Sequence, residues 1–176
     1  MSVSIFLDRD GTLIEDAGYI SSPDDVRVLP GVIQGLQLFK KNTYQLHLVS
    51  NQSGLARGKF SRADFDQVEQ RFNSIFLDSG IEFDTAHYCF HRPEENCACR
   101  KPKSGLFEQV AETEVIDKTL SGMIGNSESD RGAAEAFGIH YWDVNIETTL
   151  RENIAQFEFQ AIQIVSYFDR VLNESR

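Results

Sequence analysis

The sequence predicts an α/β fold of the doubly wound, Rossmann-like type, in which helices cover both faces of a parallel sheet. Two observations carry this prediction. Short apolar runs alternate with helical patterns over residues 3–142, and polar residues follow directly after several of these runs. Strands separated by helices normally pair in parallel, and such sheets bind ligands at the carboxyl ends of their strands. We therefore expect a ligand site where these polar residues gather.

Five short apolar runs are the expected strands. They lie at residues 3–7, at Leu46, Leu48 and Val49, at 83–90, at 123–124 and at 139–142. Each is too short for a helix of ordinary length, and the first run is typical of a buried strand.

Four helical patterns lie between these strands. The first has a face formed by Val32, Leu36 and Phe39. The second begins at Ser61, which resembles a capping box with Asp64, and Gly80 suits its end. Its apolar stripe consists of Phe65, Val68, Phe72, Ile75 and Phe76. We expect the other two helices at 105–115 and 131–137, the latter ended by Gly138.

The C-terminal part of the chain has a different pattern. We expect one domain over residues 1–145 and a C-terminal amphipathic helix, or two broken ones, over 146–176. Apolar residues recur there every three or four positions, at Ile146, Leu150, Ile154, Phe157, Ala161, Val165, Phe168 and Leu172. Packing of this stripe on the domain is the favoured interpretation. A contact in a homodimer, as opposed to a monomer, is the alternative.

Size and charge restrict the class of protein. The chain has 176 residues and a formal net charge of −10, with 41% hydrophobic and 25% charged residues. This composition is typical of one globular domain. The acidity argues against a nucleic acid or a membrane surface as partner. No apolar stretch approaches the roughly 20 residues that cross a bilayer. Since we also find no signal-peptide pattern, we expect a cytoplasmic protein.

The first candidate catalytic residues lie just after the first expected strand. Asp8 and Asp10 stand two residues apart and are followed by Gly11. Asp8 and the backbone carbonyl of Asp10 can share a hard cation such as Mg²⁺. Asp8 can attack phosphorus to form an aspartyl-phosphate, while Asp10 can protonate the leaving oxygen and later activate water. A plain polar turn is the alternative, since Asp and Gly are common turn residues.

Three later segments supply further groups that such a site needs. Ser50 and Asn51 follow the second expected strand, where a hydroxyl and backbone N–H groups can hold phosphate oxygens. Lys101 can neutralise the repulsion between carboxylates and a phosphate. Asn126 and Asp130 follow the fourth expected strand and can complete the Mg²⁺ site. Taken singly, each segment is also typical of a loop or a solvated surface.

All three cysteines lie close together, with a histidine among them. Cys89, His91, Cys97 and Cys99 have the spacing C-x-H-x5-C-x-C, which suits a structural, tetrahedral Zn²⁺ site. Such a cluster is a poor disulfide framework and is typical of a reducing compartment. His87 is a competing ligand, and buried cysteines with a surface histidine are the alternative. We expect this zinc loop, residues 89–99, to shape the chain so that Arg100 and Lys101 face the phosphate pocket.

The four segments, in this order, resemble the motifs of the haloacid-dehalogenase-like phosphatase superfamily. The resemblance covers residues 3 to about 142. The matching positions are Asp8 and Asp10, Ser50, Lys101, and Asn126 with Asp130. The resemblance implies hydrolysis of a small phosphorylated metabolite through an aspartyl-phosphate. It also implies a Mg²⁺ cofactor, with ligands from Asp8, Asp10, Asn126 and Asp130.

The zinc loop is similar to that of one branch, which contains heptose 1,7-bisphosphate phosphatases and histidinol-phosphate phosphatases. Gly18-Tyr19-Ile20 and residues 51–60 resemble the heptose enzymes, so the favoured substrate is the 7-phosphate of D-glycero-D-manno-heptose 1,7-bisphosphate. The short insert between His91 and Cys97 is closer to the histidinol-phosphate phosphatases, so histidinol phosphate is the alternative. The expected substrate-binding residues are Asn51, Arg57 and Arg100, and the two arginines are candidate donors to a second phosphate.

One position departs from the family pattern. The fourth motif normally begins Gly-Asp, whereas this chain has Gly125-Asn126. An Asn oxygen can still bind Mg²⁺, but it brings no negative charge. Three explanations are open: a weak enzyme or one with an altered metal demand, a pseudo-enzyme that binds a sugar phosphate, or an engineered change that traps a complex. The intact Asp8, Asp10 and Lys101 favour retained chemistry.

Overall fold

Five parallel strands form the central sheet of the computed structural model, which describes residues 3–145 and 155–174. The strands are β1 (Ser4–Leu7), β2 (Gln45–Asn51), β3 (Thr85–Cys89), β4 (Ser121–Gly125) and β5 (His140–Asp143). Their order is β3-β2-β1-β4-β5, and every neighbouring pair is parallel. The chain builds outward from β1 to β3 and then returns to the other side of β1. This reversal creates a switch point between β1 and β4, where doubly wound sheets bind ligands.

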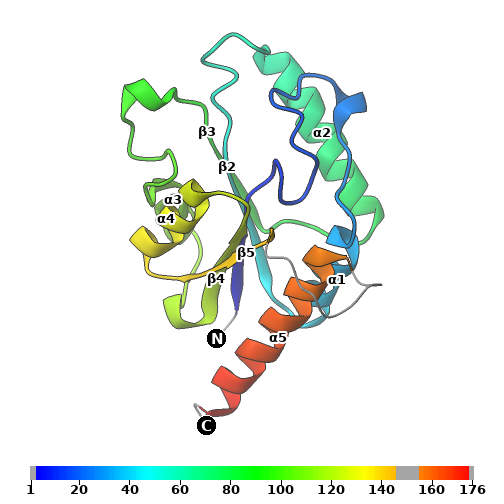
Figure 1. The fold of residues 1–176 in the computed structure, drawn as a ribbon, viewed down its shortest axis with the longest axis vertical. Coiled ribbons are helices and arrows are strands. Elements are labelled where there is room, and N and C mark those ends of the chain that lie inside the picture. The colour runs from blue at the N-terminus through cyan, green and yellow to red at the C-terminus, as the bar shows by residue number, and fades with distance from the viewer. Residues whose placement is uncertain (1–2, 146–154, 175–176) are drawn as a thin grey trace.

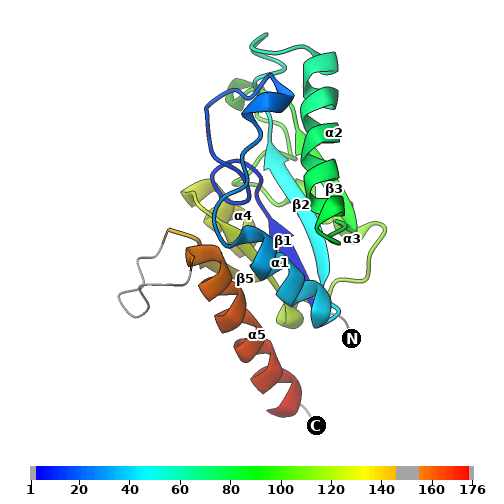
Figure 2. The ribbon, with the colours of Figure 1, turned by 90° about the vertical axis from the view of Figure 1, so that its right-hand side faces the viewer.

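Helices cover both faces of the sheet (Figures 1 and 2). The helices are α1 (Val32–Lys41), α2 (Arg62–Asp78), α3 (Gly105–Ala111), α4 (Glu128–Phe137) and α5 (Gln156–Glu174). Short 3-10 helices lie at Pro23–Asp25, Pro93–Glu95 and Lys118–Leu120. Helices α1, α2 and α5 contribute to the hydrophobic core on one face, and α3 and α4 contribute to the core on the other. The predicted doubly wound α/β fold is confirmed.

Strand β1 separates the two cores. Its Ile5 and Leu7 side chains belong to the core beneath α1, α2 and α5, whereas Phe6 belongs to the core beneath α3 and α4. All three side chains are fully buried. Successive side chains of a strand point to opposite faces, so a central strand covered on both sides is apolar throughout. The residue after Leu7 is therefore held at a rigid strand end.

Helix ends follow local capping groups. Ser61 and Asp64 form the predicted capping box at the start of α2, and Gly138 ends α4 with a φ of 85°. Helix α4 begins earlier than predicted, at Glu128, because Ser127 and Asp130 form a second capping box. Helix α3 ends earlier than predicted, at Ala111. The apolar residue that suggested a longer helix, Val115, is 93% exposed and does not extend the buried face.

Helix α5 packs against α1 through its buried residues Phe157, Ala161, Ile164 and Phe168. A Cβ atom at Gly35 of α1 would lie 2.7 Å from the Phe157 ring and 3.1 Å from Ala161, so this close approach requires glycine. The predicted stripe positions Ile146, Leu150 and Ile154 lie outside the described residues. Within the described ranges, no helix is both long and apolar enough to cross a membrane.

Candidate active site

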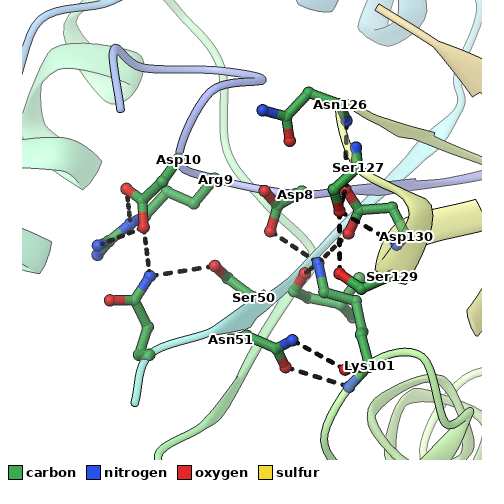
Figure 3. A network of polar contacts seen from close by, with 12 residues as sticks. Asp8, Arg9, Asp10, Ser50, Asn51, Lys101, Asn126, Ser127, Ser129 and Asp130 are labelled. Atoms are coloured by element: carbon green, nitrogen blue, oxygen red, sulfur yellow. Dashed lines mark hydrogen bonds and ion pairs between the residues drawn. The ribbon is translucent and has the colours of Figure 1, made fainter. Parts of the chain in front are cut away.

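A cavity of about 230 Å³ lies at the carboxyl ends of β1, β2 and β4, beside the loop that follows β3. Parallel strands end at the same edge of the sheet, which brings together residues far apart in the sequence. The cavity is lined by Asp8, Asp10, Asp16, Gly18, Ser50, Asn51, Lys101, Asn126, Ser127, Ser129 and Asp130. All of the predicted catalytic and Mg²⁺-binding residues are among them, and Figure 3 shows how they are arranged.

Lys101 is the buried cation of this cavity. Its Nζ donates hydrogen bonds to Asp8 Oδ1 at 2.7 Å and to the Val49 carbonyl at 2.8 Å, and it lies 2.6 Å from Asp130 Oδ1. The Lys101 side chain is 1% exposed. Burial alone lowers the pKa of Lys101, but the charges of Asp8 and Asp130 outweigh burial and raise it. The ammonium group therefore stays charged between two carboxylates.

Asp8 is a buried carboxylate with one oxygen already engaged by Lys101. Burial raises its pKa to about 6, against the opposing charge of Lys101 and with help from the negative charge of Asp130. The group is still mostly ionised at neutral pH but is poorly solvated, which suits an attacking nucleophile. Its second oxygen points toward the Asn126 side chain (Figure 3).

Asp130 uses both of its carboxylate oxygens within the protein. Oδ1 is paired with Lys101, while Oδ2 accepts hydrogen bonds from the Asn126 and Ser127 N–H groups at 3.2 and 3.1 Å. Ser127 Oγ donates a further hydrogen bond at 2.7 Å. The sequence predicted Asp130 as a Mg²⁺ ligand. The geometry favours a different contribution, in which Asp130 orients Lys101 and the backbone that carries Asn126.

Asn51 holds the backbone of Lys101. Its Nδ2 donates a hydrogen bond to the Lys101 carbonyl, and its Oδ1 accepts one from the Lys101 N–H, both at 3.1 Å. The sequence predicted Asn51 as a substrate-binding residue. It does line the cavity, but both ends of its amide are engaged in fixing the loop that carries the lysine.

Asp10 lies on the other side of Asp8 from Lys101 (Figure 3). Arg9 donates hydrogen bonds to both Asp10 oxygens, from Nε at 3.0 Å and from Nη2 at 3.1 Å. Gln52 Nε2 donates to Asp10 Oδ2 at 2.5 Å and to Ser50 Oγ at 3.1 Å. This arrangement links the expected acid–base residue to the expected phosphate-binding hydroxyl.

The residues beside Asp8 fit a magnesium ion. Mg²⁺ prefers hard oxygen ligands, and the second Asp8 oxygen, the Asp10 carbonyl and the Asn126 amide oxygen are of this kind. Figure 3 shows the Asn126 oxygen turned toward Asp8. Gly11 permits this approach, because it has a φ of 77° and any Cβ there would collide with the Asn126 amide.

The four predicted zinc ligands lie together in one cluster. The three sulfur atoms of Cys89, Cys97 and Cys99 lie 3.2 to 3.6 Å apart, and His91 Nδ1 lies 3.3 Å from Cys99 Sγ and 3.7 Å from Cys89 Sγ. Tetrahedral Zn²⁺ with Zn–S bonds near 2.3 Å places its ligand atoms roughly 3.5 to 3.8 Å apart. The cluster therefore fits Zn²⁺. The competing ligand, His87, is not a member of this cluster in the part of the chain that the structure describes.

Hydrogen bonds attach the zinc loop to the active-site framework. The Gln52 N–H donates to the Cys89 carbonyl at 2.7 Å, which joins the loop to the end of β2. Lys103 Nζ donates to the Cys97 carbonyl at 2.9 Å and to Asn96 Oδ1 at 2.6 Å. The zinc loop is therefore bonded at its start to the residue that follows β2, and near its end to Lys103, two residues after Lys101.

The two predicted donors for a second phosphate lie outside the cavity. Arg100 Nη1 donates a hydrogen bond to the His91 carbonyl at 3.3 Å, and Arg57 Nη2 lies 3.8 Å from Glu94 Oε1. We predicted that Arg100 and Lys101 would both face the phosphate pocket. Lys101 lines it, but Arg100 does not, because its guanidinium is turned toward the zinc loop.

Several polar residues of the site were not predicted from the sequence. Arg9 and Gln52 contact Asp10, while Asp16, Ser127 and Ser129 line the cavity. Arg9 and Gln52 directly neighbour predicted site residues, but adjacency alone does not indicate the direction of a side chain. For Ser127, the capping pattern Ser127-x-x-Asp130 was a usable signal for the start of α4 at this edge.

Comparisons with known proteins agree with this geometry. The chain is 41% identical over 143 residues to D-glycero-beta-D-manno-heptose-1,7-bisphosphate 7-phosphatase of Vibrio cholerae, with 77% of each chain covered. It is 43% identical over 128 residues to the enzyme of the same name from Helicobacter pylori, covering 72% of this chain and 74% of that protein.

A solved structure is similar over nearly the whole chain. The D,D-heptose 1,7-bisphosphate phosphatase from B. bronchiseptica, complexed with magnesium and phosphate, has a TM-score of 0.83 and 29% identity, and 95% of this chain and 99% of that chain are covered. The model of the family described as polynucleotide kinase 3 phosphatase matches residues 3–127. The chain therefore belongs to this family within the haloacid-dehalogenase-like phosphatases, and its relatives include heptose 1,7-bisphosphate phosphatases.

Proposed function

We propose that the protein is a Mg²⁺-dependent phosphatase that removes the 7-phosphate of D-glycero-D-manno-heptose 1,7-bisphosphate through an aspartyl-phosphate. The observation that carries this proposal is the position of Asp8. It is a buried carboxylate at the end of the central strand, held by Lys101 at 2.7 Å and open to a polar cavity. The names of the relatives from Vibrio cholerae and Helicobacter pylori support the choice of substrate.

In the first step, an oxygen of Asp8 attacks the phosphorus, and the bond from phosphorus to the sugar oxygen breaks. Asp10 gives its proton to that oxygen, which leaves as a hydroxyl group. Ser50 and the backbone around Asn51 would hold the phosphate oxygens. Lys101 neutralises part of the charge that accumulates between Asp8 and the phosphoryl group. Magnesium, bound through Asp8, the Asp10 carbonyl and Asn126, would neutralise more of that charge.

In the second step, Asp10 acts as a base. It takes a proton from a water molecule, whose oxygen attacks the phosphorus of the aspartyl-phosphate. The bond from phosphorus to Asp8 then breaks, which regenerates the carboxylate and releases inorganic phosphate. Both steps need the Asp10 carboxylate within hydrogen-bond reach of the entering or leaving oxygen.

Zinc would have a structural part in this proposal. Four protein ligands fill a tetrahedral site and leave no position for a reacting water. The zinc loop would fix the backbone that leads into Lys101. The three cysteines form no disulfide, which supports a cytoplasmic enzyme. The acidic charge of the chain supports a small metabolite as partner over a nucleic acid or a membrane.

A phosphate-release assay tests the proposal directly. Heptose 1,7-bisphosphate and histidinol phosphate are each incubated with the protein and with its Asp8→Asn variant, with and without Mg²⁺. We expect Mg²⁺-dependent release by the unaltered protein, a higher specificity constant for the bisphosphate, and no release by the variant. A preference for histidinol phosphate of about tenfold or more would assign the second substrate. Tight binding of the bisphosphate without release of phosphate would instead show that the protein is a pseudo-enzyme that binds a sugar phosphate, which is one of the explanations of Asn126.

A further inference from the structure

A buried chain of ionic contacts leads from helix α2 to Asp10. Arg9 lies between Asp8 and Asp10 in the sequence, and its side chain is only 1% exposed. Two of its guanidinium nitrogens donate to the two Asp10 oxygens. The third, Nη1, donates to Glu69 Oε1 at 2.5 Å. Two carboxylates therefore share one guanidinium, one from the catalytic loop and one from a helix that does not line the cavity.

Glu69 is itself held in place. Its second oxygen accepts a hydrogen bond from the Tyr88 hydroxyl of β3, and its side chain is 12% exposed. The Arg9 guanidinium also lies 5.8 Å from the centre of the Phe65 ring. Glu69 and Phe65 of α2 therefore fix the orientation of the Arg9 guanidinium, and Tyr88 of β3 holds Glu69 in place.

Stability of the fold alone is a poor reason for this arrangement. A buried ionic network gains little over well-packed apolar side chains of the same volume, and the neighbouring buried positions of α2, Phe65, Val68 and Phe72, are apolar. The network ends on the one carboxylate that must be aligned with the oxygen it protonates. A two-bond contact from Arg fixes the plane of a carboxylate as well as its position.

We propose that Glu69, acting through Arg9, is a positioning residue that orients the Asp10 carboxylate for proton transfer to the leaving oxygen. The inference rests on the proposed phosphatase activity. Without Glu69, the Arg9 guanidinium loses its anchor on α2, and the plane of Asp10 is no longer fixed on that side. Gln52 would then be the remaining neighbour that holds Asp10.

The choice of leaving group separates this role from a general structural one. A sugar hydroxyl is a poor leaving group and must receive a proton as the bond breaks, whereas p-nitrophenolate leaves without one. Poor alignment of Asp10 therefore slows the transfer of phosphate from a sugar far more than from p-nitrophenol. Damage to the fold or to phosphate binding would reduce both rates by the same factor.

Four variants test the proposal with these two substrates. Glu69→Ala removes the anchor, Glu69→Gln keeps an oxygen that can accept from Arg9, and Tyr88→Phe removes only the outer hydrogen bond. Asp66→Ala is the matched control, because Asp66 is an exposed α2 carboxylate paired with Arg62 at 2.8 Å. We expect Glu69→Ala to lower kcat for the heptose bisphosphate roughly 10- to 100-fold with little change in KM. The loss with p-nitrophenyl phosphate should be much smaller.

The other variants should lower kcat less than Glu69→Ala does. Glu69→Gln should recover most of the lost kcat and covers the case in which Glu69→Ala fails to fold. Tyr88→Phe should have a smaller effect, and Asp66→Ala none. Equal losses on both substrates, or no loss in Glu69→Ala, would overturn the inference while leaving the phosphatase assignment intact. A lack of turnover by the unaltered protein on both substrates would overturn the proposed function and this inference with it.

A measurement without turnover tests the anchor separately. The Nε–H signal of Arg9 in a nitrogen-correlated NMR spectrum can be assigned by its loss in Arg9→Lys. A buried, ion-paired Nε–H exchanges slowly with water, so we expect the signal to be protected in the unaltered protein and in Asp66→Ala. It should lose protection in Glu69→Ala. This Nε–H donates to Asp10, whereas Glu69 accepts from Nη1, so the signal reports whether Glu69 holds Arg9 against Asp10. Unchanged protection in Glu69→Ala would show that it does not and would overturn the inference.

Discussion

The Asp8 carboxylate and the Lys101 ammonium form an ion pair with 2.7 Å between Oδ1 and Nζ, and their side chains are 11% and 1% exposed. The two residues are 93 positions apart in the chain. Lys101 also holds Asp130, so a single cation balances two buried carboxylates. Loss of this cation would leave the negative charges of Asp8 and Asp130 facing each other and the incoming phosphate.

Lys101→Met should therefore affect both stability and activity. Removing one partner of a buried ion pair costs on the order of 3 to 5 kcal/mol, so we expect a drop of this size in the free energy of unfolding and a loss of turnover. Lys40→Met is the control, because Lys40 pairs with Asp84 at a similar distance of 2.9 Å but near the surface. Its cost should stay below about 1 kcal/mol. Urea unfolding compares the two, and equal costs would contradict the argument.

Asp8→Asn should abolish turnover and leave the fold intact. The amide is nearly the same shape as the carboxylate but is a far poorer nucleophile, and Lys101 keeps Asp130 as its counter-ion. Asp10→Asn should lower the rate by roughly 10² to 10⁴, through loss of acid–base catalysis. Phosphate release and circular dichroism are the measurements. Near-normal release by Asp8→Asn would exclude the covalent mechanism.

Asn126→Asp should tighten Mg²⁺ binding and raise turnover at low Mg²⁺. Mg²⁺ relies on one or two protein carboxylates. Asp8 supplies one, whereas Asp130 is engaged by Lys101 and by the start of α4. The gain in affinity could reach roughly 10- to 100-fold, by analogy with the loss of groups around a metal site. A Mg²⁺ titration of phosphate release decides the matter. Equal half-saturation points would mean that the side chain at this position does not bind the metal.

Each chain should hold one tightly bound zinc ion. The sulfur and nitrogen atoms of Cys89, His91, Cys97 and Cys99 all lie within 4.8 Å of one another. Metal analysis of extensively washed protein should return one equivalent, and Cys97→Ser should lose it. Because the zinc loop is hydrogen-bonded to the residues around Lys101, we expect turnover to fall in the zinc-free protein. Three freely reactive thiols in zinc-free, fully active protein would contradict both expectations.

Stability should decrease as the pH falls from about 6.5 to about 4, in part because of His47. Burial lowers the pKa of His47 to about 4, although the charge of Asp84 opposes this, and an unfolded histidine titrates near 6.5. Between these values the unfolded chain binds a proton that the folded chain does not, which favours unfolding. The loss amounts to roughly 3 kcal/mol across the whole window.

His47→Gln isolates this contribution. Groups that do not interact with His47 titrate equally in both proteins. The difference between their urea-unfolding profiles near pH 7 and near pH 5 therefore reports His47 together with its interaction with Asp84. We expect the variant to have the weaker dependence on pH. If the free energy of unfolding depended on pH equally in both proteins, the His47 ring would take up its proton as readily in the folded state as in the unfolded state.

Much of the site could be predicted from local sequence. Asp8 and Asp10 follow an apolar run, and a parallel sheet brings strand ends together, so their meeting with Ser50 and Asn126 followed from the order of the elements. The zinc cluster is also local, since its four ligands lie within a few residues of each other. The apolar stripe of α2 and its capping box were also predicted from local sequence. The hydrogen bonds of a capping box join residues only three positions apart.

Contacts between distant elements were decided only by the tertiary structure. Nothing in the spacing of the sequence indicates that Asn51 holds Lys101, that Arg100 turns away from the cavity, or that Glu69 reaches Arg9. A periodic pattern tells which side of a helix is buried, but not which residue of another element it meets. Which residues come into contact depends on how the helices and strands pack in three dimensions. A buried charge also needs polar partners that replace the water it has lost. The sequence by itself determined the fold class and the candidate catalytic carboxylates, whereas tertiary packing decided which side chains contact them.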